Sequence, residues 1–341
     1  MYKTNNFFKN KKILVIGGTG TIGSSLVRTL LNQDIDVIRV LSRDEHKQYN
    51  MMQELKGIKN IRFLLGDVRD YDRINRAMED IDVVFHTAAL KHVPACEYNP
   101  FEAVKTNVIG TQNVIEAAIK NNVERVILTS SDKTISPTNT YGATKLLAER
   151  LISAADYYKG KHKTIFAAVR FGNVMGSRGS VIPLFKKQIL KKKEITVTDP
   201  TMSRFMMTVA QATNLTLEAC KRAKGGEVFV LKMPVIRLKD LVEVVIEEMS
   251  KRYKINPAEI KITETGLRPG EKMYEELMTF EESKYAIEFD DMFAVPPLFN
   301  HKTYDYGEGR RAPMKTYSSH DIEPMSKEEL RNLIIQEKLL D

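Results

Sequence analysis

A glycine-rich turn near the start of the chain, Gly17-Gly18-Thr19-Gly20-Thr21-Ile22-Gly23, follows a short aliphatic run at residues 12–16. Residues 24–31, directly after it, have the apolar spacing of a helix. Glycine at these positions lets the backbone turn tightly, approach a pyrophosphate and pack helix against strand, while the helix amino terminus favours negative charge. The pattern predicts a dinucleotide-binding unit whose cofactor contacts come from Gly17, Thr19, Gly20, Thr21, Ile22 and Gly23.

The first half of the chain repeats this alternation of strand and helix. Further strands are expected at residues 36–41, 61–65, 83–87, 126–130 and 164–170, and helices at residues 71–78, 100–121 and 141–158. The repetition predicts an α/β fold, a Rossmann-type doubly wound parallel sheet with helices on both faces. Residues 1–172 are expected to form this cofactor domain, with part of about 205–235 completing the sheet.

The regular alternation of strand and helix patterns ends after residue 172. Three glycines make residues 171–181 an expected irregular loop, residues 238–251 have the pattern of a helix, and residues 296–321 are polar and rich in turns. Residues 173–204 and 236–341 are expected to form a smaller mixed α/β substrate lobe. Such a lobe would cover the carboxyl edge of the sheet, where open α/β sheets bind ligands.

Composition excludes several classes of protein. The 341 residues are 43% hydrophobic, and no apolar run approaches the length of a membrane span or a signal peptide. Two cysteines, Cys96 and Cys220, favour a reducing compartment. The chain has a net charge of +8, but its basic residues are interspersed with acidic ones. The densest basic segment, residues 186–193, has the pattern of a solvated helix face. We therefore expect a soluble cytoplasmic enzyme without a nucleic-acid partner, membrane anchor or metal.

The end of the second strand indicates which nicotinamide cofactor is bound. An enzyme that uses NAD places a carboxylate there for the ribose 2′-hydroxyl, whereas an arginine suits the 2′-phosphate of NADP. Arg43, helped by Ser42 and Lys47, favours NADP. The alternative is that Arg43 is a solvated loop residue and that Asp44 holds the ribose.

Residues after the third and fourth strands complete the expected cofactor pocket. Asp67 and Val68 are expected beside the adenine, and the small residues Ala88 and Ala89 would let the cofactor lie against the backbone.

Two further segments have the residue types of an active site. Tyr141 and Lys145 are four residues apart at the start of an expected helix, so they face the same way. An ammonium group next to a tyrosine favours the phenolate and lowers the pKa of the phenol, which predicts a tyrosine base. Ser131, Asp132 and Lys133 follow the fifth strand directly.

These motifs resemble the extended short-chain dehydrogenases, and within them the short, soluble branch of the UDP-N-acetylglucosamine 4,6-dehydratases. The resemblance extends over about residues 11–321. Its marks are the glycine turn and the segments Ser42-Arg43-Asp44-Glu45, Ala88-Ala89-Leu90-Lys91-His92-Val93-Pro94, Ser131-Asp132-Lys133, Tyr141-Gly142-Ala143-Thr144-Lys145, Arg170-Phe171-Gly172-Asn173-Val174 and Leu267-Arg268-Pro269-Gly270-Glu271-Lys272. The Asp-Lys pair is the most specific mark, because related dTDP-glucose dehydratases have Asp-Glu there and sugar 4-epimerases have no such pair.

The resemblance implies a reaction and a role for each residue. Tyr141 would take the C4 hydroxyl proton while Ser131 steadies that oxygen, and Lys145 would hold the nicotinamide ribose. Neutral Lys133 would then remove the C5 proton, and protonated Asp132 would donate to the departing C6 hydroxyl. The family pattern has Ala and Val where this chain has Thr134 and Ile135, so the wall near the sugar differs.

The same resemblance implies the remaining contacts. Lys91 and Asn107 join the cofactor site, and this fold commonly pairs into dimers or higher homo-oligomers. The UDP-sugar contacts implied are Lys91, His92, Asn173, Ser180, Val181, Arg204, Arg268 and Glu271.

Two other functions fit parts of the pattern. A nucleotide-sugar 4-epimerase needs the Tyr-Lys pair and not Asp132-Lys133. A non-catalytic NADP-sensing regulator of the same fold can dispense with Tyr-x-x-x-Lys, which is present in this chain.

Overall fold

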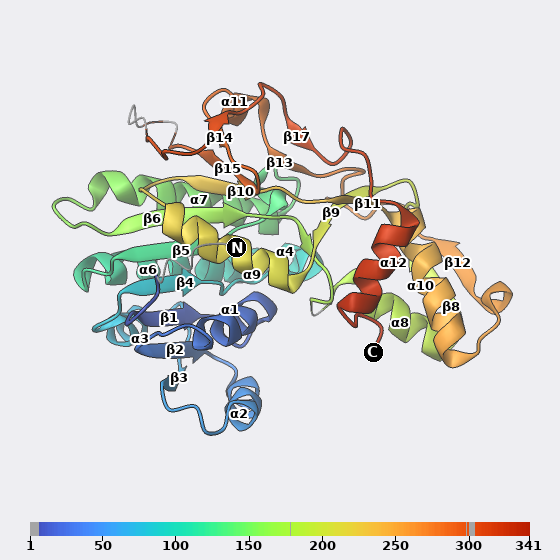
Figure 1. Ribbon diagram of the computed structural model, residues 1–341, viewed down its shortest axis with the longest axis horizontal. Helices are drawn as coiled ribbons and strands as arrows, with labels where there is room; N and C mark the ends of the chain where they lie inside the picture. The colour runs from blue at the N-terminus through green and yellow to red at the C-terminus, as the bar shows by residue number, and fades with distance from the viewer. Residues whose placement is uncertain (1–6, 178, 298, 300–303) are drawn as a thin grey trace.

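The computed structural model describes residues 7–177, 179–297, 299 and 304–341. Its main feature is a sheet of ten strands within those residues (Figure 1). From edge to edge the strands are β16 (Arg310–Arg311), β14 (Ile287–Glu288), β15 (Met292–Val295), β10 (Val228–Leu231), β6 (Ile165–Arg170), β5 (Arg125–Thr129), β4 (Val83–His86), β1 (Lys12–Ile16), β2 (Val37–Ser42) and β3 (Ile61–Leu65).

The first six strands give the order 3-2-1-4-5-6 of a Rossmann sheet, all parallel, and β10 extends it in parallel beside β6. This confirms the predicted fold. The strands are largely apolar runs, such as Ile-Leu-Val-Ile in β1, because both faces are covered by helices.

Helices cover the two faces of the sheet in layers (Figure 1). α1 packs against α9 on one face, whereas α6 packs against both α3 and α7. The bounds are α1 (Thr21–Leu31), α2 (Glu45–Glu54), α3 (Tyr71–Met78), α4 (Val93–Tyr98), α5 (Pro100–Ala103), η1 (Val104–Ile109), α6 (Gly110–Lys120), η2 (Asp132–Thr134), α7 (Thr140–Tyr158) and α9 (Val209–Arg222).

Several predicted elements differ in detail. Strands expected at 36–41, 83–87, 126–130 and 164–170 differ by one residue at one or both ends, and helix ends differ by up to three. The single helix expected at 100–121 is wrong: α5 and α6 are separated by the π-helical turn η1, which buries Thr106 and Asn107. Helices α2, α4 and α9 were not predicted, and neither was α12 (Lys327–Gln336).

A second hydrophobic cluster lies beside the sheet, at the right of Figure 1. It is built by α8 (Val181–Lys192), α10 (Leu238–Tyr253), α12 (Lys327–Gln336) and the parallel pair β8 (Glu194–Val197) and β12 (Lys261–Glu264). The short elements between it and the sheet are β7 (Asn173–Val174), β9 (Ser203–Met207), β11 (Val235–Arg237), β13 (Glu276–Met278), α11 (Phe280–Ser283) and β17 (Tyr317–Ser318), whereas η3 (Pro257–Glu259) packs on α10.

The late part of the chain also returns to the main sheet. β15, whose four residues are all buried, pairs antiparallel with β10, and β14 and β16 continue that edge. Residues 287–311, expected in the substrate lobe, thus contribute strands to the sheet. β7 likewise falls inside the segment expected to be an irregular loop.

One buried charge cluster fastens the end of β6 to both neighbouring elements. The Arg170 guanidinium is 1% exposed and donates to Glu149 of α7 at 2.7 and 3.1 Å, and to Glu282 of α11 at 3.0 Å through two nitrogens. It also donates to the Leu277 carbonyl at 2.8 Å. Burial alone would lower the pKa of Arg170, but the two carboxylates raise that pKa by a larger amount, so the net shift is upward.

Candidate active site

The glycine turn after β1 is shaped for a phosphate group. A Cβ atom on Gly17, whose φ is +80°, would lie 2.7 Å from the Ala88 backbone nitrogen, and one on Gly23 would lie 2.4 Å from the Gly17 carbonyl oxygen. Only glycine fits at both places. Gly20 precedes α1 without a side-chain cap, which leaves the helix amino terminus suited to an anion. The residues present therefore fit the phosphates of a dinucleotide.

The two candidates for the contact with the cofactor ribose, Arg43 and Asp44, directly follow β2 and have different surroundings. The Asp44 carboxylate caps α2, accepts from the Lys47 backbone N–H at 3.0 Å and pairs with the Lys47 ammonium, which together hold its pKa low. Arg43 is 55% exposed and lies 3.7 Å from Asp67. Ser42 is hydrogen-bonded to Thr19 of the glycine turn at 2.7 Å. Asp44 is thus already engaged by its own helix, whereas Arg43 is exposed beside the cofactor turn.

The π-helical turn η1 positions the loop that follows β4. The Asn107 amide accepts from the Leu90 N–H at 2.8 Å and donates to the Leu90 carbonyl at 2.9 Å and to the Thr144 hydroxyl at 3.0 Å. It therefore links residues 88–92, including the exposed Lys91 and His92, to the helix of Tyr141. Its predicted contact with the cofactor stays a prediction.

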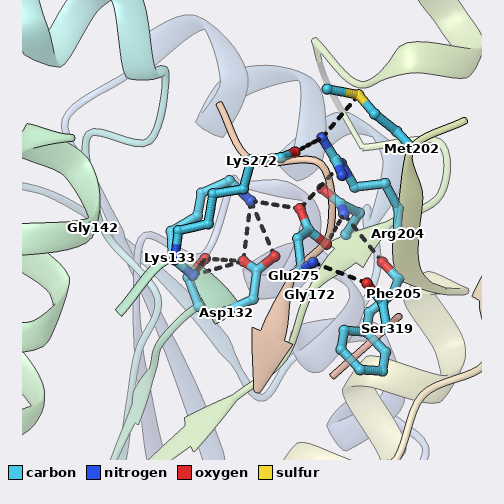
Figure 2. A network of polar contacts seen from close by, with 12 residues as sticks. Asp132, Lys133, Gly142, Gly172, Met202, Arg204, Phe205, Lys272, Glu275 and Ser319 are labelled. Atoms are coloured by element: carbon cyan, nitrogen blue, oxygen red, sulfur yellow. Dashed lines mark hydrogen bonds and ion pairs between the residues drawn. The ribbon is translucent and has the colours of Figure 1, made fainter. Parts of the chain in front are cut away.

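An acid and a base lie in contact directly after β5. The Lys133 ammonium is 3.1 and 3.2 Å from the two Asp132 oxygens (Figure 2). The Ser131 hydroxyl donates to Asp132 at 2.7 Å. Burial raises the pKa of Asp132, yet Lys133 and the hydrogen bonds bring it below its usual range. The carboxylates in turn raise the pKa of Lys133 despite burial. At rest the pair is ionised, the reverse of the protonation states expected during the reaction.

Helix α7 brings Tyr141 and Lys145 to the same place. A Cβ atom on Gly142 would lie 2.1 Å from the Lys133 carbonyl oxygen, so only glycine lets this helix pack so closely on η2. Lys145 is buried and donates to the Thr129 carbonyl at 2.6 Å, and burial lowers the pKa of Lys145 to about 8.

The tyrosine environment differs from the prediction. Burial raises the pKa of Tyr141, and the groups that oppose this effect are the Ser131 hydroxyl, through a hydrogen bond, and the Lys133 ammonium. The expectation that Lys145 would lower the pKa of Tyr141 is therefore wrong at rest, because the buried Lys145 ammonium is held by Thr129.

A residue that the sequence analysis missed completes the cluster. Glu275, just before β13, is 9% exposed and places Oε1 3.4 Å from the Lys133 ammonium. Its carboxyl is hydrogen-bonded to that of Asp132, and burial, followed by the Asp132 charge, raises the pKa of Glu275 to about 7. The signal in the sequence was the pair of acidic residues Glu275-Glu276, shortly after the Arg268 motif.

Two residues expected to contact the UDP-sugar also contact Glu275, and Figure 2 shows one of them, Arg204, beside it. Asn173 of β7 donates to Glu275 at 2.8 Å, and the Arg204 Nε atom of β9 lies 3.4 Å from it. Arg204 also donates to the carbonyls of Ser203, Lys272 and Met273 at 2.8, 2.8 and 3.1 Å. Their predicted contacts with substrate stay predictions.

The loop of residues 268–275 is tied to the acid–base segment. Lys272 donates to the Ile135 carbonyl at 2.9 Å, and Thr138 and Asn139 donate to the Gly270 carbonyl at 2.8 and 3.2 Å. Two other expected substrate contacts belong to this loop, where the Arg268 N–H donates to the Glu271 carboxylate at 3.2 Å. The remaining ones lie on other segments: His92 has its ring against Gly179, and Ser180 and Val181 are at the amino terminus of α8.

Two features are absent from the part of the chain that the structure describes. It holds no group of three His, Cys, Asp or Glu side chains arranged to bind a metal. Within the same residues, no helix combines the length and the apolar character needed to cross a membrane.

Comparison with known proteins places this geometry among relatives. A family model described as polysaccharide biosynthesis protein matches residues 13–297. The X-ray structure of Pen from Bacillus thuringiensis is 58% identical, with a TM-score of 0.92, and the match covers 98% of this chain and 100% of that one.

Two curated relatives match over almost their whole length. An uncharacterized membrane protein of Methanocaldococcus jannaschii is 53% identical over 97% of each chain. A protein of Rickettsia bellii named UDP-glucose 4-epimerase is 40% identical over 96% of each chain.

Proposed function

Because the chain belongs to the polysaccharide biosynthesis family of extended short-chain dehydrogenases, we propose that it is an NADP-dependent UDP-N-acetylglucosamine 4,6-dehydratase. The product would be a UDP-4-keto-6-deoxy-N-acetylhexosamine for surface glycan synthesis. The observation that carries the proposal is the contact of Asp132 with Lys133, 3.1 Å apart and linked through Ser131 to Tyr141. An epimerase or a simple dehydrogenase has no use for this additional acid and base.

The residues that would hold NADP are the glycine turn, Arg43 and Lys145. When bound, NADP supplies the acceptor of hydride at C4 and the donor of hydride at C6. Tyr141 removes the C4 hydroxyl proton, and Ser131 orients that oxygen. The resulting ketone makes the C5 proton acidic, so neutral Lys133 removes it while Asp132 protonates the departing C6 hydroxyl.

The hydrogen bonds of the site provide a route by which each catalytic group regains its starting protonation state after these steps. Lys133 returns its proton to C5, whereas Asp132 has lost one proton to water and Tyr141 has gained one from C4. Ser131 donates to Asp132 at 2.7 Å and is hydrogen-bonded to Tyr141. The tyrosine proton can therefore pass through Ser131 to Asp132 and reset both groups.

The nucleotide end of the substrate would lie between α8 and the loop of residues 268–275. The amino terminus of α8 at Ser180 and Val181 suits a diphosphate, as does a guanidinium such as that of Arg268. Glu271 would hold the uridine ribose.

A nucleotide-sugar 4-epimerase is the second candidate, because the Rickettsia bellii relative has that name at 40% identity. The same Tyr141 and Lys145 would serve it. Asp132 and Lys133 would then have no chemical task, which is why we place it second.

The reaction is tested with UDP-N-acetylglucosamine deuterated at C4. We expect product deuterated at C6, many turnovers without added NADP and no accumulation of free NADPH, because the hydride taken at C4 is returned to the same sugar. Mass spectrometry and NMR locate the label. A 4-epimer that keeps deuterium at C4 would favour the epimerase, and label on released NADPH would exclude both.

The choice of cofactor rests on Arg43. Charge-assisted contacts to phosphate contribute about 1.5–3 kcal/mol, so Arg43→Ala is expected to weaken NADP binding about tenfold or more and to leave NAD binding nearly unchanged. Calorimetric titration of both cofactors measures this, with the exposed Arg76→Ala as a control of equal charge. Equal affinity of the native protein for NAD and NADP would refute the assignment.

A further inference from the structure

Glu275 lies where it can act on both the acid and the base of the site. Its carboxyl contacts the Lys133 ammonium at 3.4 Å (Figure 2). It also lies within hydrogen-bonding reach of the Asp132 carboxyl. The side chain is held from two further strands, by Asn173 of β7 at 2.8 Å and by Arg204 of β9 at 3.4 Å. Ser319 fixes its backbone through bonds of 2.8 and 2.9 Å. The carboxyl is thus rigidly placed and nearly excluded from water.

The charge of this carboxyl decides whether Lys133 can become a base. Five titratable groups face one another here: Asp132, Lys133, Glu275, Arg204 and Tyr141. If Asp132 and Glu275 were both ionised, two carboxylates would hold the Lys133 proton at 3.1 and 3.4 Å. If Glu275 is protonated, only one carboxylate opposes the release of that proton, and the burial of Asp132 favours the neutral form of the remaining pair.

We propose that Glu275 is a positioning residue that acts as a neutral carboxyl beside the acid and the base, so that Asp132 is the one carboxylate that holds the Lys133 proton and Lys133 can release it. The inference rests on the proposed dehydratase function and adds a third group to its elimination step. Glu275 touches the acid and the base and is not assigned a contact with substrate.

The step balances within the cluster. The N–H bond of the Lys133 ammonium breaks and an O–H bond forms on Asp132 across their 3.1 Å contact, which gives the free amine and the carboxylic acid that elimination needs. Glu275 keeps its proton throughout. When Lys133 takes the C5 proton and Asp132 protonates the C6 oxygen, the resting ion pair is restored and water leaves. No further reactant is required.

The kinetic test compares pH profiles of single turnovers in native protein, Glu275→Gln and Glu276→Gln. The amide of Glu275→Gln stays neutral at every pH. Glu276→Gln removes the same charge from the next residue, which is the first residue of β13. The formation of reduced-cofactor absorbance reports C4 oxidation, and its decay reports elimination and hydride return.

We expect the native decay rate to fall about tenfold per pH unit above about 7, as for the loss of one essential proton. In Glu275→Gln the reduced-cofactor absorbance should decay at a rate that does not depend on pH between about 6.5 and about 8. Glu276→Gln should behave like the native protein. Formation rates should share one profile in all three. A native decay rate that does not change above pH 7, or a fall that persists in Glu275→Gln, would overturn the inference.

A second measurement needs neither substrate nor cofactor. A carboxyl whose pKa is higher in the folded than in the unfolded protein binds more protons when folded, so the free energy of unfolding decreases as pH rises from the unfolded value to about 7. Urea denaturation should show this decrease to be smaller in Glu275→Gln than in Glu276→Gln. Equal pH dependence of the two variants would contradict a proton on Glu275.

Failure of the inference and failure of the proposed function give different results. If the native protein forms no dehydrated product at any pH, the dehydratase assignment is lost. If it forms product but Glu275→Gln retains the alkaline fall, only the role of Glu275 is lost.

Discussion

Replacing Lys133 by Met is expected to stop the enzyme after C4 oxidation. Without the amine no group removes the C5 proton, and loss of a general base of this kind slows a reaction by about 10²–10⁴-fold. On addition of substrate the absorbance of reduced nicotinamide should rise and persist. Mass spectrometry of the quenched mixture should find a 4-keto sugar that retains its C6 hydroxyl.

The control is Lys251→Met, which removes the same charge from an exposed position on α10, where Lys251 pairs with Glu248. It should leave the rise and decay of absorbance unchanged. Full product formation by Lys133→Met would remove this lysine from the mechanism, and absence of any absorbance change would show that it is needed already for binding or oxidation.

Replacing Arg170 by Met should lower the free energy of unfolding by about 3–5 kcal/mol, the usual cost of leaving a buried charge without its partner. Glu149 and Glu282, 3% and 6% exposed, would both lose their counter-ion. Urea denaturation measures the loss. The exposed Arg76→Met on α3 serves as the control and should change stability by less than about 0.5 kcal/mol.

A compensated variant separates charge from packing. If the cost comes from the stranded carboxylates, adding Glu149→Gln and Glu282→Gln to Arg170→Met should restore part of the lost stability. If stability falls further, the arginine stem and its bond to the Leu277 carbonyl matter more than the charges.

The cofactor half of the fold could be predicted because each element carries its own signal. Buried parallel strands are short aliphatic runs, and the glycine turn between β1 and α1 has a specific stereochemical demand. Two missed helices also carried a signal, since α9 begins with the capping box of Thr208 and Gln211, and α12 with that of Ser326 and Glu329.

Other features depend on contacts that no local pattern contains. The π-helical turn follows from the packing of Asn107 between Leu90 and Thr144. Likewise, Glu275 meets Lys133 across 142 residues of chain, through the folding of β13 beside η2. The contact of Asp132 with Lys133 was predictable from adjacency, whereas their resting charges depend on burial and on Glu275.

The Arg170 cluster also sets an order of events during synthesis of the chain. Arg170 and Glu282 are 112 residues apart, which corresponds to roughly 6–22 s of translation at ~5–20 residues per second. Over that interval the guanidinium at the end of β6 has Glu149 alone as its acidic partner, and β10, once it is made, still lacks β15 at its open edge. The nascent cofactor half must therefore wait, incomplete and with an unprotected strand edge, until residues near the carboxyl end leave the ribosome.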